Sequence, residues 1–151
     1  MKEIDRIKNQ LEKAFWGNAW HGPSVMESLD AINSVKASVR SVDNTHSIWE
    51  IVLHTDAWQK VVKTRLNGKN INLSDDEDWS QVISKDENSW NITLTTLAEN
   101  FKTLLESVST FDESALNEMV IRQSYSNYFM LHGLVQHYVY HAGQISLLKK
   151  F

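Results

Sequence analysis

Two histidines near the C-terminus of the chain have the spacing of metal ligands. His137 and His141 lie four residues apart within residues 133–144 (GLVQHYVYHAGQ), a helix-forming and otherwise apolar stretch. Four residues are about one helical turn, so both imidazoles leave the same face of one helix. A third histidine, His54, lies inside an earlier helical segment. One imidazole from one helix and two from another can bind a metal ion through three nitrogens and leave coordination positions open.

The histidine spacing alone is weak evidence for a metal. Six histidines in 151 residues produce such a pair by chance about 0.2 times. The alternative is that the three histidines are partly buried side chains with ordinary hydrogen-bond partners. A buried neutral imidazole without partners costs roughly 1–3 kcal/mol, and a shared cation would satisfy one nitrogen on each ring at once. The residues alone leave both interpretations open.

Two polar residues are placed to orient the imidazoles. Glu50 lies one helical turn before His54, and Gln144 follows His141 by three residues. Outer partners of this kind hold a ligating imidazole in position. For Glu50, a capping box with Ser47 is the simpler role. No glutamate accompanies the histidine pair as it does in HExxH metalloproteases, so a protease would lack its general base.

Three aromatic residues are candidates for a pocket beside the site. Trp58 follows the earlier histidine on the same predicted helix, where packing is its favoured role. Trp20 and His21 lie in a turn, and a surface position is favoured for the histidine. His46 is expected at a helix start and His132 at solvent or an interface, so neither is expected to bind metal. The sequence identifies no catalytic residue.

The composition limits the classes of function. Apolar residues make up 42% and charged residues 23% of the chain, and the formal net charge is −4 without a basic stripe. This argues against nucleic-acid binding, and the short apolar runs argue against a membrane span. The N-terminus does not have the pattern of a secretory leader, and there is no cysteine. A cytoplasmic location is expected, and any metal must be held by nitrogen or oxygen ligands.

Helical periodicity runs through most of the chain. The few glycines and the single proline favour a helical over a β fold. We predict an all-α four-helix bundle with additional short helices, forming one domain over residues 1–151. The predicted helices cover residues 2–15, 25–39 (a shorter one), 47–66, 84–108 and 128–149.

Local signals mark where these helices begin and what separates them. A serine followed three residues later by a glutamate predicts a capping box at each of three starts. The pairs are Ser24 with Glu27, Ser47 with Glu50, and Ser84 with Glu87.

The stretches between the helices are less regular. Residues 69–80, with the acidic run Asp75–Asp78, are expected to be an exposed loop rather than an EF-hand. Residues 110–127 are ambiguous, with one short helix expected around residues 114–120.

Three segments of the sequence resemble the DinB-like (DinB/YfiT-like) superfamily of metal-binding four-helix bundles. They are residues 20–24 (WHGPS), residues 46–54 (HSIWEIVLH) with Trp58, and the histidine-pair segment up to Ile145. Their order and spacing match the family across almost the whole chain. In the family pattern, one histidine near the middle of the second long helix and a pair on the last helix bind the metal.

The resemblance implies a site and a range of activities. The matching ligands are His54, His137 and His141, holding a divalent ion, commonly nickel or zinc and sometimes iron or manganese, with water completing the shell. Homodimers are frequent in the family. Characterised relatives include transferases that use bacillithiol or other low-molecular-weight thiols and a mycothiol-dependent isomerase, whereas many members have no assigned reaction.

Three functions follow from this resemblance as expectations. The first is a metal-dependent enzyme of the thiol S-transferase type, which activates a thiol or water for a small-molecule substrate. The second is a metal-dependent hydrolase. The third is a non-catalytic, stress-associated binding module in which the metal is structural.

Overall fold

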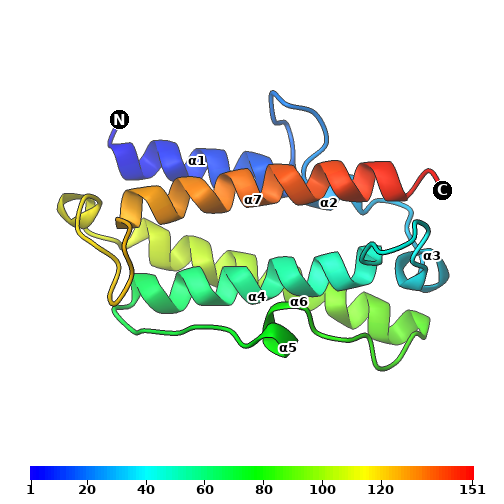
Figure 1. Ribbon diagram of the computed structural model, residues 1–151. Helices are drawn as coiled ribbons and strands as arrows, with labels where there is room; N and C mark the ends of the chain where they lie inside the picture. Colours follow the sequence, from blue (N-terminus) through cyan, green and yellow to red (C-terminus); the bar gives the residue numbers. More distant parts are fainter.

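Four long helices lie side by side and form the body of the molecule (Figure 1). The computed structural model describes residues 1–151. The long helices are α1 (Glu3–Trp16), α4 (Ile48–Leu66), α6 (Glu87–Ser109) and α7 (Asn127–Leu148). Short helices occupy the connections: α2 (Val25–Ser28), α3 (Ser34–Ser38), α5 (Asp75–Asp78) and the 3-10 turn Glu113–Ala115. The predicted all-α class is confirmed, and none of the helices is long and apolar enough to cross a membrane.

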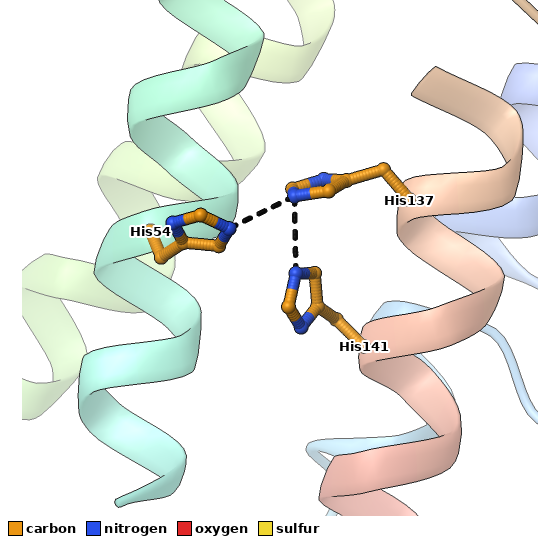
Figure 2. A group of neighbouring side chains, drawn as sticks. All are labelled: His54, His137 and His141. Carbon is orange, nitrogen blue, oxygen red and sulfur yellow. Dashed lines mark hydrogen bonds between the residues drawn. The ribbon is translucent and has the colours of Figure 1, made fainter. Parts of the chain in front are cut away.

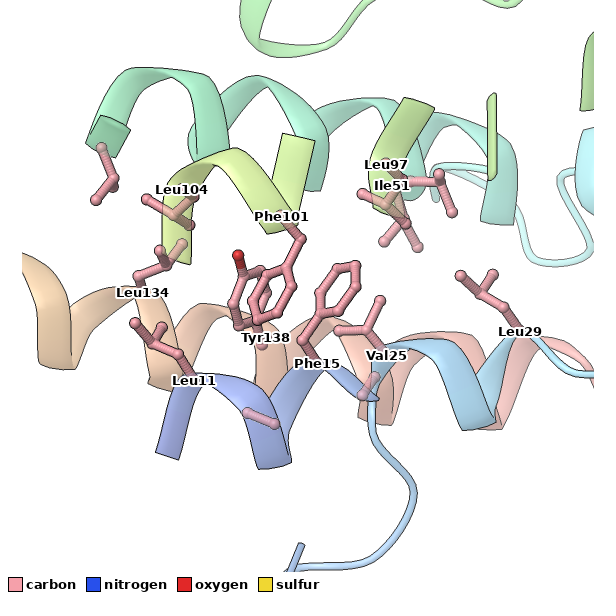
Figure 3. Close-up of a cluster of buried hydrophobic side chains, with 14 of the residues drawn as sticks. Leu11, Phe15, Val25, Leu29, Ile51, Leu97, Phe101, Leu104, Leu134 and Tyr138 are labelled. Atoms are coloured by element: carbon pink, nitrogen blue, oxygen red, sulfur yellow. The ribbon is translucent and has the colours of Figure 1, made fainter. Parts of the chain in front are cut away.

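Three aromatic rings meet at the centre of the bundle (Figure 3). Together with one buried amide, they join all four long helices. The rings of Phe15 and Phe101 stack with centroids 3.9 Å apart, and Tyr138 packs edge-on against both. The Tyr138 hydroxyl donates to Oε1 of Gln59 at 2.8 Å, and the Gln59 amide donates to the Leu97 carbonyl at 3.2 Å. Burial raises the pKa of Tyr138 well above its usual value, so the phenol stays a neutral donor.

Two of the three predicted capping boxes are present. Ser24 accepts from the backbone N–H of Glu27, and the Glu27 carboxylate accepts from the backbone N–H of Ser24. Ser47 and Glu50 form the same reciprocal pair at the start of α4. Each box satisfies backbone donors that the first helical turn leaves free, and the second fixes where the helix carrying the earlier histidine begins.

The third predicted capping box, Ser84 with Glu87, is wrong. The N-cap of α6 is Asp86, whose carboxylate accepts from the backbone N–H of Ser89 at 2.8 Å. The Glu87 carboxylate accepts instead from the backbone N–H of Ser34 at 2.8 Å, at the start of α3. An aspartate in the N-cap position competes with a serine two residues earlier, and the glutamate is released for a tertiary contact.

The predicted helix over residues 25–39 is also wrong, because it is interrupted. Ala31 has a φ of +59°, which no helix interior tolerates, and Asn33 caps a new helix by accepting from the backbone N–H of Lys36. The break turns Val35 and Val39 outward, and both are exposed although an unbroken helix over 25–39 would place them on one apolar face with Val25, Leu29 and Ile32.

Two further segments differ from expectation. The stretch 69–80 contains the short helix α5 within the predicted loop. The short helix expected around residues 114–120 is only the 3-10 turn Glu113–Ala115. Met119 instead forms an isolated β-bridge with Ser126, and the backbone N–H of Val120 donates to the Tyr125 carbonyl.

We expect Tyr138→Phe to destabilise the protein by about 1–3 kcal/mol, because it leaves the buried amide oxygen of Gln59 without its donor. Urea unfolding followed by circular dichroism measures this. Tyr140→Phe is the matched control, since Tyr140 lies on the same helix with its side chain 64% exposed. Equal stability of the two variants would contradict the role given to the central hydrogen bond.

Candidate metal centre

Three imidazoles converge between α4 and α7 (Figure 2). Nε2 of His137 lies 3.0 Å from Nε2 of His54 and 3.0 Å from Nε2 of His141. The ligand atoms of all three lie within 4.8 Å of one another. Nitrogens bound to one tetrahedral ion at about 2.0–2.1 Å are roughly 3.3 Å apart, so the cluster is close to the size that such an ion requires.

The protons on these rings do not suffice to satisfy the three facing nitrogens. Nδ1 of His54 lies 2.9 Å from the backbone carbonyl of Asp78, and Nδ1 of His141 lies 2.7 Å from Oε1 of Gln144. Both oxygens are acceptors, so each Nδ1 carries the proton and each Nε2 presents a lone pair. His137 can donate from Nε2 to only one of them. A cation at the centre would satisfy all three lone pairs, and the residues therefore fit a metal.

Burial keeps the two imidazoles of α7, those of His137 and His141, neutral. It lowers the pKa of His137 to about 3, and the neighbouring His141 and His54 lower it further in the same direction. Burial likewise lowers the pKa of His141 to about 4, although its hydrogen bond to Gln144 acts in the opposite sense. Neutral imidazole is the form that binds metal, so at neutral pH no proton has to leave these two rings.

The segment that was expected to be a solvated loop supplies two neighbours of the site. Asp78, at the end of α5, lies with Oδ1 2.9 Å from Nδ1 of His54 and accepts from the indole of Trp58 at 2.7 Å. Trp79 stacks on the His54 ring at 3.9 Å and on His46 at 3.6 Å, nearly parallel to both. The expectation that Asp78 is a solvated loop residue is thus wrong. His46 lies at the start of α4 as expected, directly before the N-cap Ser47.

Sequence reasoning missed both neighbours because no local pattern marks them. Asp78 and Trp79 follow His54 by more than twenty residues, and only the return of the chain along α4 brings them to it. The one available signal was the tryptophan itself, an apolar residue within a polar and acidic stretch.

The remaining candidates are divided between the site and the surface. Gln144 contacts His141, as described above, and the Trp58 ring lies 6.2 Å from that of His137. Glu50 pairs with Arg40 and caps its own helix. Trp20 and His21 are exposed on the loop that projects between α1 and α2 (Figure 1), and they make no contact with the three imidazoles.

A comparison with protein-family models decides the family. The model of the DinB superfamily matches residues 11–145, nearly the whole chain and all three histidines. The chain belongs to the DinB superfamily. No curated protein and no solved structure matches it significantly. Family membership and the converging histidines together fit a metal-binding site.

An apolar cavity opens beside His137 in this DinB-superfamily protein. It has a volume of about 240 Å³ and lies between α4 and α7. Trp58, Val62 and Leu134 are among its walls, and His137 forms one end. A molecule in this cavity would therefore lie directly against the histidine cluster, between mostly apolar walls.

Glu50 provides a prediction for the pH dependence of stability. Burial would raise its pKa, but hydrogen bonds from Arg40 and Ser47 outweigh burial and lower the pKa to about 2. Because the folded pKa is below the unfolded value of 4.5, the stabilisation is present above that pH and is lost as the pH falls towards 2.

We expect Glu50→Gln to lower the free energy of unfolding by about 1–3 kcal/mol at neutral pH. The loss is limited because Arg40 is largely exposed and solvent screens its charge. The difference from the unmodified protein should shrink as the pH falls from 4.5 towards 2. Urea unfolding across this pH range measures both curves. A difference that stays constant with pH would rule out the ionised Glu50 as its source.

Asp78→Ala should weaken binding of zinc or nickel about tenfold, because His54 loses the carboxylate that helps to hold its ring while the backbone carbonyl remains. Isothermal titration calorimetry measures the affinity. Asp76→Ala is the matched control, as Asp76 is exposed on the same short helix. If both variants bind metal as the unmodified protein does, Asp78 has no part in orienting the ligand.

Proposed function

We propose that this protein is a divalent-metal-dependent enzyme that transfers a low-molecular-weight thiol to a small electrophilic substrate. The single observation that carries the proposal is the convergence of three Nε2 atoms, with more lone pairs than protons, at the end of an apolar cavity. Three imidazoles hold an ion without neutralising it and leave at least one coordination position for a reactant.

Some residues of the site hold the metal-binding imidazoles in position, and others border the cavity beside them. Asp78 and Gln144 fix the rings of His54 and His141 with their Nε2 lone pairs inward. Trp79 covers one face of the His54 ring and Trp58 borders the cavity, so bulk water is kept from that side. A divalent ion bound there lowers the pKa of a neighbouring thiol or water.

The thiol must come from outside the chain, because the chain contains no cysteine. In the proposed reaction the thiol sulfur forms a bond to an electrophilic carbon, the leaving group departs with the bonding electrons, and the thiol proton is released. A metal-dependent hydrolase would use the same ligands with water in place of the thiol. In a non-catalytic module the ion would only stabilise the fold.

The finer expectations belong to the same proposal. The ion is nickel or zinc in preference to iron or manganese, because a site of nitrogen ligands generally binds the first two more tightly. The protein acts as a cytoplasmic homodimer on a small molecule, without nucleic-acid or membrane partners. Metal analysis of the purified protein and light scattering test the ion and the dimer directly.

The test combines metal content with turnover. We expect about one ion per chain and conjugation of bacillithiol to chlorodinitrobenzene, with the C–Cl bond broken and chloride released. His54→Ala and His137→Ala should lose the ion and reduce turnover by about 100-fold or more, because two imidazoles hold an ion poorly. His21→Ala, at an exposed histidine, is the control.

Unchanged turnover in both cluster variants would refute the proposal. Thiol-independent hydrolysis of an ester that is lost in the same variants would favour the hydrolase. A large fall in melting temperature on chelation, with neither activity detectable, would favour a structural ion.

A further inference from the structure

A positively charged side chain in the wall of the cavity beside the histidines has no acidic side chain as a partner. Arg65 is 6% exposed and lines the cavity, and it is absent from all ion pairs of the molecule. Its guanidinium donates to the Tyr125 hydroxyl at 2.6 Å, the Ile71 carbonyl at 2.8 Å and Oδ1 of Asn72 at 3.3 Å. All three acceptors are neutral, and Nε has no acceptor. A buried charge in this condition is costly unless an anion accompanies it.

We propose that this cavity binds a small apolar carboxylate, with its carboxylate at Arg65 and Tyr125 and its apolar body pointing towards His137. Tyr125 also lines the cavity, and its hydroxyl accepts from Arg65 while its own proton has no acceptor in the structure. A guanidinium and a hydroxyl at one end of a pocket are suited to the two oxygens of a carboxylate.

The dimensions of the cavity limit the ligand. A cavity of about 240 Å³ lies between the roughly 150 Å³ that holds benzene and the 300–1,000 Å³ of sites for drug-sized ligands. The rest of the lining is apolar and includes Val62, Met130 and Leu134. An aromatic or short branched carboxylate fits this volume and these walls.

Trp58 connects the two ends of the cavity. Its ring lies 5.9 Å from the guanidinium carbon of Arg65 and 6.2 Å from the centre of the His137 ring. A ligand that lies along this indole would reach both the cationic end and the histidine cluster. Trp58 also provides a spectroscopic signal, because its fluorescence and its indole N–H report on occupancy.

Gly133 leaves the cavity open. It lies on α7 one helical turn before His137 and lines the cavity, and a Cβ built on it meets nothing within 4 Å. A larger side chain at this position therefore has room for its Cβ and would occupy part of the cavity. Gly143 lies on the same helix, is exposed and likewise has open space around it, so it offers the same substitution away from the cavity.

The inference rests on the proposed function only in that the carboxylate would be the substrate of the same site. Binding itself depends on Arg65 and not on the ion or the thiol. It can therefore be measured on the metal-free protein, separately from turnover.

The experiment compares benzoate with benzyl alcohol, a neutral molecule of similar size, by calorimetry and by two-dimensional NMR of the metal-free protein. We expect benzoate to bind at least about tenfold more tightly, because only benzoate supplies the missing anion. Arg65→Met should remove this preference and leave the binding of benzyl alcohol unchanged. Inorganic phosphate, as a second anion without an apolar body, should not compete.

The glycine variants test the location. Gly133→Leu should abolish benzoate binding, and Gly143→Leu should leave it intact. Equal affinity for benzoate and benzyl alcohol, or competition by phosphate, overturns the proposal, and this comparison needs no variant if Arg65→Met does not fold. Benzoate binding that survives Gly133→Leu also overturns it. Loss of turnover in His54→Ala without any Arg65-dependent binding would refute this inference alone, and Arg65-dependent binding with turnover unchanged in His54→Ala and His137→Ala would refute the proposed function alone.

Discussion

Tyr138 and Gln59 meet at the centre of the bundle, where the phenol of α7 donates to the amide of α4 and the amide donates onward to α6. Both groups are fully buried, so neither can exchange its partner for water. This contact fixes the position of α7 along α4. His137 is the immediate neighbour of the tyrosine, and His54 lies on α4 just over one turn from the glutamine. The convergence of the imidazoles depends on that register.

The histidine cluster shows how the surroundings of a site decide its chemistry. The acceptors at His54 and His141 place protons on the outer nitrogens of both rings and direct their lone pairs to one point. Burial favours the neutral form of His137 and of His141. The fold thus keeps three basic nitrogens close together without enough protons for hydrogen bonds among all of them. This arrangement is unfavourable in the absence of a cation and favourable in its presence.

The apolar cavity adds a second uncompensated group, a positive charge without an anion. At one end lie the lone pairs of the histidines, and at the other the guanidinium of Arg65 has no negative partner. Polar groups left in such a state lower stability, and proteins retain them where a ligand completes them. A metal ion at the histidines and the carboxylate of a small apolar molecule at Arg65 would together satisfy both ends of the site.

The sequence by itself determined the features that depend on neighbours within one helical turn: the common face of His137 and His141, and two of the three capping boxes. It also gave the all-α class, because helical periodicity repeats locally. The tertiary structure alone decided that Asp78 and Trp79 lie against His54 and that Arg65 is buried without an acid. Such contacts join residues distant along the chain, and they depend on how complete helices pack, which no local spacing encodes.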